Sequence, residues 1–470
     1  MSGPGAEVPQ RRAGASGLQR RAGACGLQRR AGAGVSRRQV AAWALWDCGS
    51  TGLNAIVATF VFSVYLTGTV AEGMAGPTSA ASWLGRTLTI AGVVVALLAP
   101  LVGVWVQAPQ RRRVALVSLT VLAVGFTATM SLIRADPRYL AAGLALLALT
   151  AACGDLASVP YNAMLRQLST PQTAGRISGL GWAAGYSGSV LLLLIIYVGF
   201  ISGDGPDRGL LELPVADGQN VRAAMIAAAC WLAILALPLL FTAHRLADGG
   251  EPAPPVGGVL AGYRQMFDDL RGEWRRDRNL VYYLIVSAVF RDGLAGIFAF
   301  GAVLGVSVYG ISQADVLIFG VVASTVAAVG AVVGGRLDDR IGAKPILISS
   351  LTSLIIVGAA LMATSGPAAF WVCGLLLCLF VGPTQSAART LLLRMTGEGK
   401  EGVSFGLYTM TGRAAAPLAP WLFFVFVDLF DSDRAGLAGI LVVLAAGLVG
   451  MLAVRVPDRR VSATSVGETH

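Results

Sequence analysis

The chain has 470 residues, of which 55% are hydrophobic and only 13% are charged. A soluble domain carries about twice that share of charged residues, and its core does not need repeated apolar runs of about 20 residues. The composition therefore excludes a soluble globular protein and predicts an all-α, polytopic membrane protein.

Residues 1–40 form a low-complexity basic tail, in which the unit QRRAG recurs at Gln10, Gln19 and Gln28. Its Gly, Ala and Arg content lacks the apolar surface that folding needs, so we expect a disordered extension. The alternative is an anchor that binds anionic lipids. The apolar run after the tail has full membrane-spanning length and no small-residue cleavage pattern, so a cleaved signal peptide is not expected.

Six apolar runs of membrane-spanning length follow the tail and predict an N-terminal six-helix half over residues 41–242. The expected spans are Ala41–Leu66, Trp83–Val106, Val114–Ile133, Tyr139–Tyr161, Ile177–Phe200 and Val221–Phe241.

A polar segment, residues 243–279, separates this half from the rest of the chain. It opens with Pro and Gly residues and then places apolar side chains at three- and four-residue spacing, with arginines around them. This spacing predicts an amphipathic helix on the cytoplasmic membrane face, serving as a lid and an anchor. Its apolar positions are Leu260, Tyr263, Phe267, Leu270 and Trp274.

Six further apolar runs predict a C-terminal six-helix half over residues 280–455, followed by a polar cytoplasmic tail, residues 456–470. Two six-helix halves with pseudo-two-fold symmetry, joined by a long basic loop, are the plan of a secondary transporter. The expected spans are Leu280–Val306, Asp315–Gly335, Pro345–Met362, Ala368–Ala388, Gly402–Val427 and Ala435–Val454.

Lys and Arg residues gather in the tail and in alternate loops, whereas the opposite loops carry mainly acids, such as Asp204, Asp207 and Glu212. This positive-inside asymmetry predicts a multi-pass protein of the cell membrane with both termini in the cytoplasm. The same distribution accounts for the net charge of +10 and argues against nucleic acid as a partner.

The turn between the expected eighth and ninth spans reads GRLDDRIGAK, from Gly335 to Lys344. It resembles the loop signature of the major facilitator superfamily, whose fold has twelve transmembrane helices. The resemblance implies a gating role for Gly335, Asp339, Arg340, Gly342 and Lys344. Gly335 would let two helices approach closely, and Asp339 would cap a neighbouring helix or pair with an arginine. Contacts of this kind hold one gate state and break in the other.

The equivalent turn of the first half reads GVWVQAPQRRR. Gly103 and the cluster of bases match the signature, but the position of the expected acid is Gln107. We therefore expect the corresponding gating contact of the first half to be weaker or to be formed by other residues.

Five stretches of the sequence point to one branch of this superfamily. They are YNAMLRQLSTPQTAGRISGLGWAAGYSG from Tyr161, WALWDCGSTGLN in the first span, Asp292-Gly293, GPTQSAART and FGLYTMTGR. Together they resemble the UMF1 branch of the superfamily, which is related to the yeast vacuolar amino-acid effluxer of the autophagy-related 22 type. The first span departs from that branch, with Trp46-Asp47-Cys48-Gly49-Ser50-Thr51 in place of Tyr-Asp-Trp-Ala-Asn-Ser. The resemblance covers residues 41–455 and implies transport of amino acids or related metabolites, with export favoured.

Charged residues inside the expected spans point to mechanism, because a charge in the bilayer is costly and usually functional. Arg291 and Asp292 are adjacent, so they point about 100° apart on a helix and each needs its own partner. One pair that the sequence allows is Asp292 with Arg413. The candidate residues for binding substrate or proton are Asp292, Arg413, Arg291, Asp47, Asp155, Gln385 and Arg389.

In the functional interpretation, Asp292 exchanges protons while Arg413 or Arg291 holds a substrate carboxylate. The alternative is a static, buried ion pair that sets the register of the helices. The same two interpretations apply to Asp47 and Asp155. Gln385 and Arg389, one turn apart on one helix face, would line the cytoplasmic mouth.

The remaining motifs do not indicate catalysis. The two histidines lie at a membrane edge and at the chain end, so proton coupling would fall to a carboxylate. The cysteines are scattered, and no Gly-x-x-x-x-Gly-Lys-Ser/Thr loop occurs. The GLGWAAG stretch lies inside an apolar span, where it predicts helix packing rather than dinucleotide binding. We expect neither an enzyme nor a metal or cofactor.

The sequence thus predicts a secondary active transporter that moves a small solute by alternating access. Protons are the expected coupling ion, and the protein is expected to work as a monomer in the lipid bilayer. One alternative is a proton-coupled exporter of hydrophobic compounds or drugs. The second alternative is a non-transporting membrane receptor or scaffold with the same fold.

Overall fold

The computed structural model describes residues 36–74, 78–247 and 278–456, together with residues 263, 264, 268, 271, 272 and 275 of the central segment. The predicted basic tail up to residue 35 lies outside the described residues. So do Leu260, Phe267, Leu270 and Trp274 of the predicted amphipathic helix. Tyr263 is described, and its hydroxyl donates a hydrogen bond of 2.6 Å to the carbonyl of Leu97.

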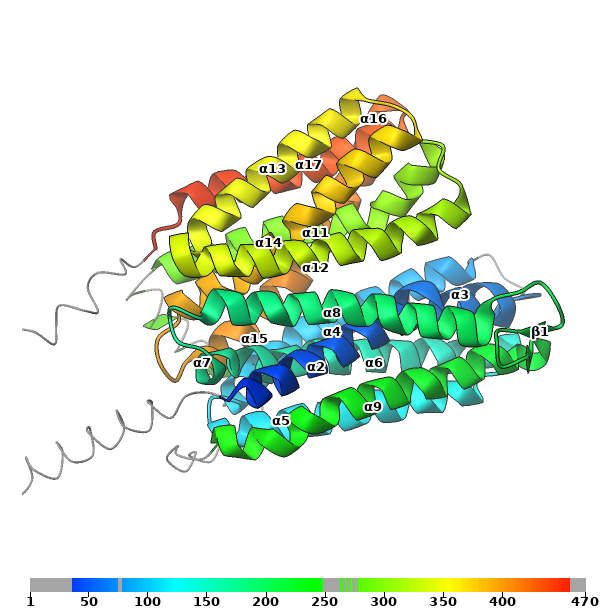
Figure 1. Ribbon diagram of the computed structural model, residues 1–470, viewed down its shortest axis with the longest axis horizontal. Coiled ribbons are helices and arrows are strands. Elements are labelled where there is room, and N and C mark those ends of the chain that lie inside the picture. Colours follow the sequence, from blue (N-terminus) through cyan, green and yellow to red (C-terminus); the bar gives the residue numbers. More distant parts are fainter. Residues whose placement is uncertain are drawn as a thin grey trace, which may run out of the picture.

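Within the described residues, twelve helical segments are long and apolar enough to cross a membrane, which confirms the predicted number of spans. Figure 1 shows them as two bundles lying against each other. The N-terminal bundle contains α2 (Arg37–Asn54) with its continuation α3 (Phe62–Tyr65), α4 (Ala80–Trp105), α5 (Pro109–Thr129), α6 (Leu140–Ala163), the short α7 (Leu165–Leu168), α8 (Ala174–Ile196) and α9 (Gln219–Ala247).

The C-terminal bundle supplies the other six spans. It contains α11 (Arg278–Ser307), α12 (Gln313–Ile341), α13 (Ala343–Ala363), α14 (Pro367–Met395), α15 (Glu401–Ala415), α16 (Leu418–Phe430) and α17 (Asp433–Ala453). Two antiparallel β-strands, β1 (Asp207–Arg208) and β2 (Leu213–Pro214), pair in the loop between α8 and α9, with Asp207 opposite Pro214.

Helix α2 begins before the predicted start at Ala41 because Ser36 caps it. The Ser36 hydroxyl accepts the Gln39 backbone N–H at 3.3 Å, and the Gln39 side chain accepts the Ser36 N–H at 3.1 Å. This reciprocal capping satisfies two backbone donors that a helix start leaves unpaired. The first span also continues past Asn54 as π-helical turns at Ala55–Phe60 and Leu66–Val70.

The predicted eleventh span, Gly402–Val427, is present but consists of two helices. Helix α15 ends at Ala415 and α16 begins at Leu418, with a turn at Ala416 and Pro417. Proline has no backbone N–H and its ring clashes with the carbonyl of the preceding turn, so Pro417 and Pro420 favour a break here. The break leaves the first N–H groups of α16 without helical partners.

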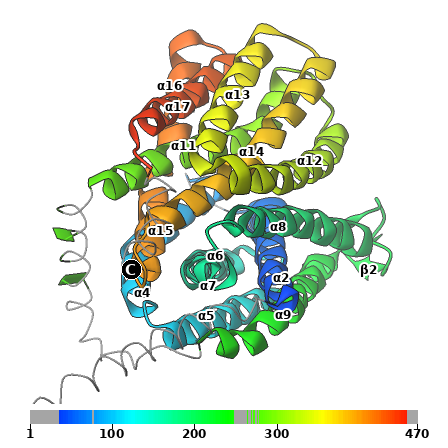
Figure 2. The same ribbon diagram turned by 60° about the vertical axis from the view of Figure 1, so that its left-hand side comes forward.

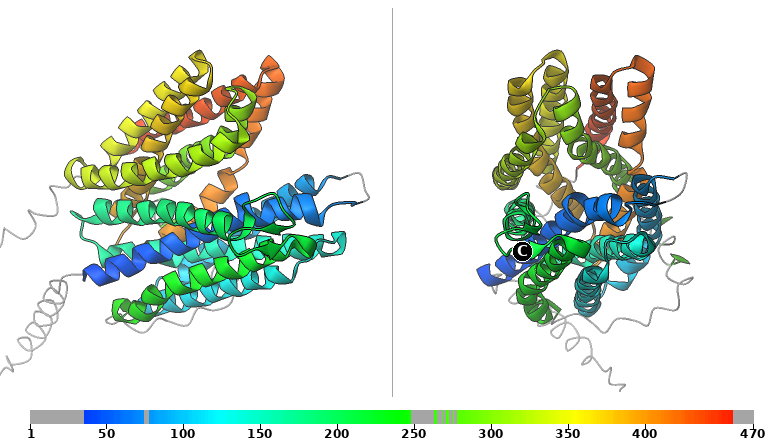
Figure 3. Two further views of the ribbon diagram at one scale, coloured as in Figure 1. Left: turned by 45° about the vertical axis from the view of Figure 1, so that its right-hand side comes forward. Right: turned by 90° about the vertical axis from the view of Figure 1, so that its right-hand side faces the viewer.

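Both described chain ends lie at one end of the bundle, which we call the terminal end; the opposite end is the far end (Figures 1 and 3). The halves meet through α8 against α12, α4 against α15, and α14 against α8 (Figure 2). Figure 3 shows the two halves close together at the terminal end and diverging toward the far end.

The outer surface of the bundle is apolar. Large side chains on different helices are mostly exposed, at 65% for Ile90, 69% for Phe241, 63% for Ile356 and 68% for Val449. In water such a surface would be a liability, whereas lipid chains solvate it without cost. The pattern is that of helices embedded in a bilayer.

Candidate functional site

A cavity of about 420 Å³ lies between the two halves, and both contribute to its wall. Its lining includes residues of α2, α5, α6 and α8 from the first half and of α11, α14 and α15 from the second. All seven residues singled out from the sequence as binding candidates line it: Asp47, Asp155, Arg291, Asp292, Gln385, Arg389 and Arg413. Their assignment to substrate or proton binding stays a prediction.

An ion pair joins the halves across this cavity. The guanidinium of Arg413, on α15, binds the carboxylate of Asp155, on α6. The Asp155 side chain is 26% exposed and that of Arg413 is 41% exposed, so a solute that enters the cavity can reach both. The pair of Arg413 with Asp292 allowed by the sequence does not form in the structure, because Arg413 turns to the opposite half.

A second ion pair across the halves is more buried. The guanidinium of Arg389, on α14, lies 3.9 Å from the carboxylate of Asp47, on α2. The Asp47 carboxylate also accepts a hydrogen bond of 3.4 Å from the Thr51 hydroxyl one turn further along α2. Three aromatic rings of the first half surround Arg389. The residue therefore reaches into the first half from the second.

Arg291 is held within its own half. Its Nη1 donates a hydrogen bond of 3.0 Å to the carbonyl of Tyr408, and its guanidinium lies 3.6 Å from the centre of the Tyr408 ring. A Cβ at Gly412 would lie 3.0 Å from both terminal nitrogens of Arg291, so the guanidinium packs closely against this glycine. These contacts fix Arg291 against α15 as a cation over an aromatic face.

Asp292 is satisfied by the helix break. Its carboxylate accepts the backbone N–H of Ala419 at 2.5 Å, and the residue is 6% exposed. Ala419 lies in the first turn of α16, where unpaired N–H groups and the helix dipole favour a negative charge. A helix N-terminus is therefore the partner that a buried carboxylate needs at this depth.

The halves touch at the terminal end through glycines. A Cβ at Gly335 on α12 would collide with the Gly175 carbonyl on α8, and Gly179 of α8 packs on Gly335 and Ala331. The Asp339 carboxylate accepts the N–H groups of Gly175 at 2.8 Å and of Arg176 at 3.2 Å. Asp339 thus caps α8, a helix of the opposite half.

Other positions of the predicted gating turn act inside the second half. Gly342 ends α12 with a φ of +99°, a conformation that favours glycine. Lys344 donates to the carbonyls of Leu452 and Val454 near the end of α17, at 3.1 and 2.7 Å. Arg340 lies in the last turn of α12, where a cation is favourable.

A matching contact joins α4 to α15. A Cβ at Gly103 would lie 2.6 Å from the Gly402 carbonyl and 3.1 Å from the Cα of Gly406. Gly103 and Gln107 occupy the places in the first half that Gly335 and Asp339 occupy in the second, and Gly402 and Gly406 correspond to Gly175 and Gly179 by the same chain separation. Gln107 stands where the capping acid would be.

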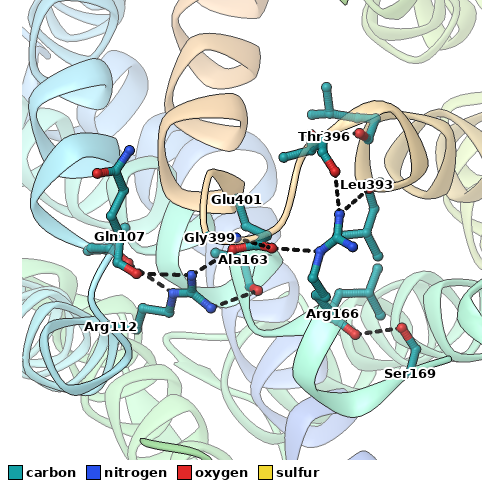
Figure 4. Close-up of polar contacts among 12 residues, drawn as sticks. Gln107, Arg112, Ala163, Arg166, Ser169, Leu393, Thr396, Gly399 and Glu401 are labelled. Carbon is teal, nitrogen blue, oxygen red and sulfur yellow. Dashed lines mark hydrogen bonds and ion pairs between the residues drawn. The ribbon is translucent and has the colours of Figure 1, made fainter. Parts of the chain in front are cut away.

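Glu401 supplies a carboxylate at this contact instead. It is 2% exposed and binds Arg112 at 2.9 Å and Arg166 at 2.6 Å, as Figure 4 shows. Arg112 also donates to the carbonyls of Val106 at 2.9 Å and Gln107 at 3.2 Å. The lock of the first half is therefore built on a residue of the second half, with the charge displaced from the turn to the start of α15.

The grouping of Glu401, Arg112 and Arg166 was not predicted from the sequence. Nor was the role of Asp338, which is fully buried and binds Arg394 and Thr390. Charged residues near span ends are ordinary, so their type carries no signal. The repeated Gly-x-x-x-Gly spacing of Gly175 and Gly402 was the pattern that could have located this second contact.

Among the described residues, no three His, Cys, Asp or Glu side chains come together as a metal site. The charged groups of the cavity are two carboxylate–arginine pairs, the carboxylate of Asp292 at the start of α16, and the guanidinium of Arg291 on the ring of Tyr408. Such a set can bind charged and zwitterionic solutes and exchange protons.

Solved structures with the same architecture define the class. The proton:xylose symporter XylE bound to 6-bromo-6-deoxy-D-glucose matches with a TM-score of 0.65, at 12% identity over 88% of this chain and 93% of that one. The transporter FucP in the outward conformation matches at 0.62, with 12% identity over 90% and 100%. A bacterial ferroportin homologue in the outward-facing state matches at 0.64, with 13% identity over 88% and 97%. The fold is that of the major facilitator superfamily.

Sequence comparison identifies the family to which the chain belongs. The family model for proteins described as "Vacuole effluxer Atg22 like" matches residues 36–464, and the chain belongs to this family. A curated relative, the uncharacterized MFS-type transporter YxiO of Bacillus subtilis (strain 168), is 22% identical over 414 residues, covering 88% of this chain and 94% of that protein. The protein is a multi-pass membrane transporter of the secondary type and not an enzyme.

Proposed function

We propose that the protein exports an amino acid or a related carboxylate-bearing solute by proton-coupled alternating access. The observation that carries the proposal is that two carboxylate–arginine pairs, Asp155–Arg413 and Asp47–Arg389, both line one cavity and both cross between the halves. Alternating access moves one half against the other. Pairs that cross the interface must break and re-form in each cycle.

Asp155 is the proposed proton carrier. It is the cavity carboxylate with an accessible side chain and a partner on the opposite half. The carboxylate of Asp292, by contrast, already accepts a hydrogen bond from the first turn of α16. A proton on Asp155 removes the charge that holds Arg413. The freed guanidinium then binds the carboxylate of the solute through charge-assisted hydrogen bonds.

The terminal end is proposed to face the cytoplasm, on the strength of the positive-inside asymmetry. The closure at Asp339 and Glu401 would then be the cytoplasmic gate, and the diverging far end would open to the outside. In this assignment the structure represents an outward-facing state, with Gly335, Gly103 and their partner glycines forming the closed gate.

Export of hydrophobic compounds fits the cavity less well. An apolar ligand would strip water from charged side chains without replacing their hydrogen bonds, which is costly. A receptor or scaffold with the same fold would leave the inter-half pairs permanently closed, and would give no flux in a transport assay.

The test is solute-evoked proton flux in proteoliposomes, over a panel of amino acids and small metabolites. At least one solute is expected to drive flux in the wild type. Asp155→Asn is expected to reduce proton flux by about tenfold or more while solute counterflow persists, since the substitution removes the proton site but keeps its shape. Asp428→Asn, an exposed site outside the cavity lining, is the matched control.

Silence of the wild type across the panel would contradict the proposal. Equal proton flux in wild type and Asp155→Asn would transfer the proton site to Asp47 or Asp292.

A further inference from the structure

Three buried hydrogen-bond donors around Arg389 have no close partner in the fold. Nη1 of Arg389, the hydroxyl of Tyr161 and Nε1 of Trp182 make no hydrogen bond of 3.5 Å or less with the described residues. The Tyr161 hydroxyl lies beside the carboxylate of Asp47 and the guanidinium of Arg389. Arg389 is 5% exposed and Tyr161 is 1% exposed, and all three residues line the cavity. A buried donor without a partner is costly, so three of them in one place need an explanation.

The donors are held in place by aromatic packing. The guanidinium carbon of Arg389 lies 5.1 Å from the ring centre of Trp182, 5.4 Å from that of Trp43 and 5.6 Å from that of Tyr161. Tyr161 is itself stacked between Trp43 and Trp46, with ring centres 4.4 and 4.5 Å apart. Side chains packed in this way lose little freedom when a ligand arrives.

The hydrogen-bonding atoms of the cluster favour an anion. Asp47 is the carboxylate beside Arg389, but it approaches Nη2 at 3.9 Å, which is longer than a hydrogen bond, and leaves Nη1 free. The unused atoms are all donors: one on a cation, one hydroxyl and one indole N–H. A planar carboxylate has two oxygens that accept several such bonds at once.

The cluster is also divided between the halves. Tyr161 and Trp182 lie on α6 and α8 of the first half, whereas Arg389 lies on α14 of the second. An anion bound by all three would therefore connect the halves. The surroundings differ from those of Arg413, because the pair of Arg389 with Asp47 is more buried than the pair of Arg413 with Asp155.

We propose that Arg389, Tyr161 and Trp182 form a carboxylate-binding subsite, which receives the carboxyl group of the transported solute. The inference rests on the proposed function and deepens it, because it makes a free carboxylate an obligatory feature of the substrate. Asp47 remains paired with Arg389 on its other nitrogen and lies next to the bound group, where it can meet the ammonium of a zwitterion.

The test is ligand-dependent thermal stabilisation of the full-length protein in detergent. The probes are the L-amino acids, their methyl esters and the corresponding decarboxylated amines, each titrated to give a dissociation constant. In the wild type, at least one free acid is expected to bind about tenfold or more tightly than its ester and its amine. The amine has no acceptor for the donors, and the ester has no negative charge to pair with Arg389.

Substitutions of the three residues locate the effect. Tyr161→Phe and Trp182→Phe each remove one donor and keep an aromatic ring, and each is expected to lower the preference for acid over ester several-fold. Arg389→Gln is expected to abolish the preference, and Arg389→Lys to restore part of it. Tyr186→Phe is the matched control: it deletes a hydroxyl on α8 at a residue that does not line the cavity, and the preference should persist.

The proposal is overturned if the acid and its ester bind equally in the wild type. It is also overturned if the preference survives in Arg389→Gln or in both aromatic variants, or if no carboxylate-bearing probe binds. These failures are distinct from failure of the proposed function. Solute-evoked proton flux with an unchanged acid preference in the variants would refute the subsite alone, whereas absence of flux in the wild type would refute transport.

Discussion

Asp292 shows that a charge deep in a membrane helix can be stabilised by a backbone rather than by an opposite charge. Its carboxylate accepts the Ala419 N–H at the start of α16, which exists as a helix start only because the eleventh span breaks at Pro417. Asp292 and the break therefore support each other. The residue acts here as the cap of a half-helix.

Asp292→Ala is accordingly expected to lower the midpoint of thermal unfolding in detergent, since losing a helix cap costs about 0.5–2 kcal/mol. Asp292→Asn keeps an oxygen acceptor and should lower it less. Asp428→Ala, at an exposed site on α16, should leave the midpoint unchanged. Loss of proton flux in Asp292→Asn, with normal stability, would instead make Asp292 the proton carrier.

Glu401 is the residue on which the closure between α4 and α15 depends. Glu401→Gln leaves Arg112 buried without its carboxylate, and breaking a buried pair costs about 3–5 kcal/mol. We expect the fraction of molecules that are closed at the terminal end to fall sharply. Distances between spin labels placed on the two halves at that end should lengthen.

Glu398→Gln is the control for this variant, because Glu398 is exposed and lies in the loop that precedes α15. Unchanged distances in Glu401→Gln would mean that the glycine contacts alone keep the terminal end closed.

At the scale of elements, two helix crossings of the same kind join the halves. In each, a glycine near the end of one helix packs on a Gly-x-x-x-Gly pair of a helix in the other half. Small residues let helix backbones approach closely, which is the main source of helix association in lipid. The crossings differ in their polar contact: Asp339 caps α8, whereas Glu401 pairs with two arginines.

Gly335→Ala tests the first crossing. The added Cβ would collide with the Gly175 carbonyl, a backbone atom that cannot turn aside, so the terminal end should open. Gly320→Ala makes the same change on the same helix, at a position where a Cβ meets nothing within 4 Å. Spin-label distances at the terminal end should increase in Gly335→Ala only. An increase in both would implicate α12 itself rather than the crossing.

At the scale of the whole molecule, the closed terminal end and the diverging far end correspond to one state of the proposed rigid-body cycle. The proposed orientation predicts which end of the molecule is accessible from outside the cell. In a cysteine-free background, Leu210→Cys at the far end should react with a membrane-impermeant thiol reagent in intact cells. Gln172→Cys at the terminal end should react only after permeabilisation. Both positions are exposed. The reverse pattern would invert the assignment of the two faces.

The number of spans, their approximate limits and the seven cavity residues could be predicted from the sequence. An apolar run of bilayer length is a local property, and a charge such as Asp155 or Arg413 inside such a run stands out because lipid excludes it. The superfamily likewise followed from one turn, Gly335 to Lys344, whose residues are adjacent in the chain.

The partners of these residues were decided by the tertiary structure. Asp155 binds Arg413, and Asp47 lies beside Arg389. Glu401 supplies the carboxylate that is missing at position 107. All of these contacts cross the interface between the halves. Sequence periodicity shows which face a residue occupies on its own helix, but not which distant helix lies opposite. The packing of two six-helix halves makes that choice, and it brings isolated charges together in a cavity and in the contacts that join the halves.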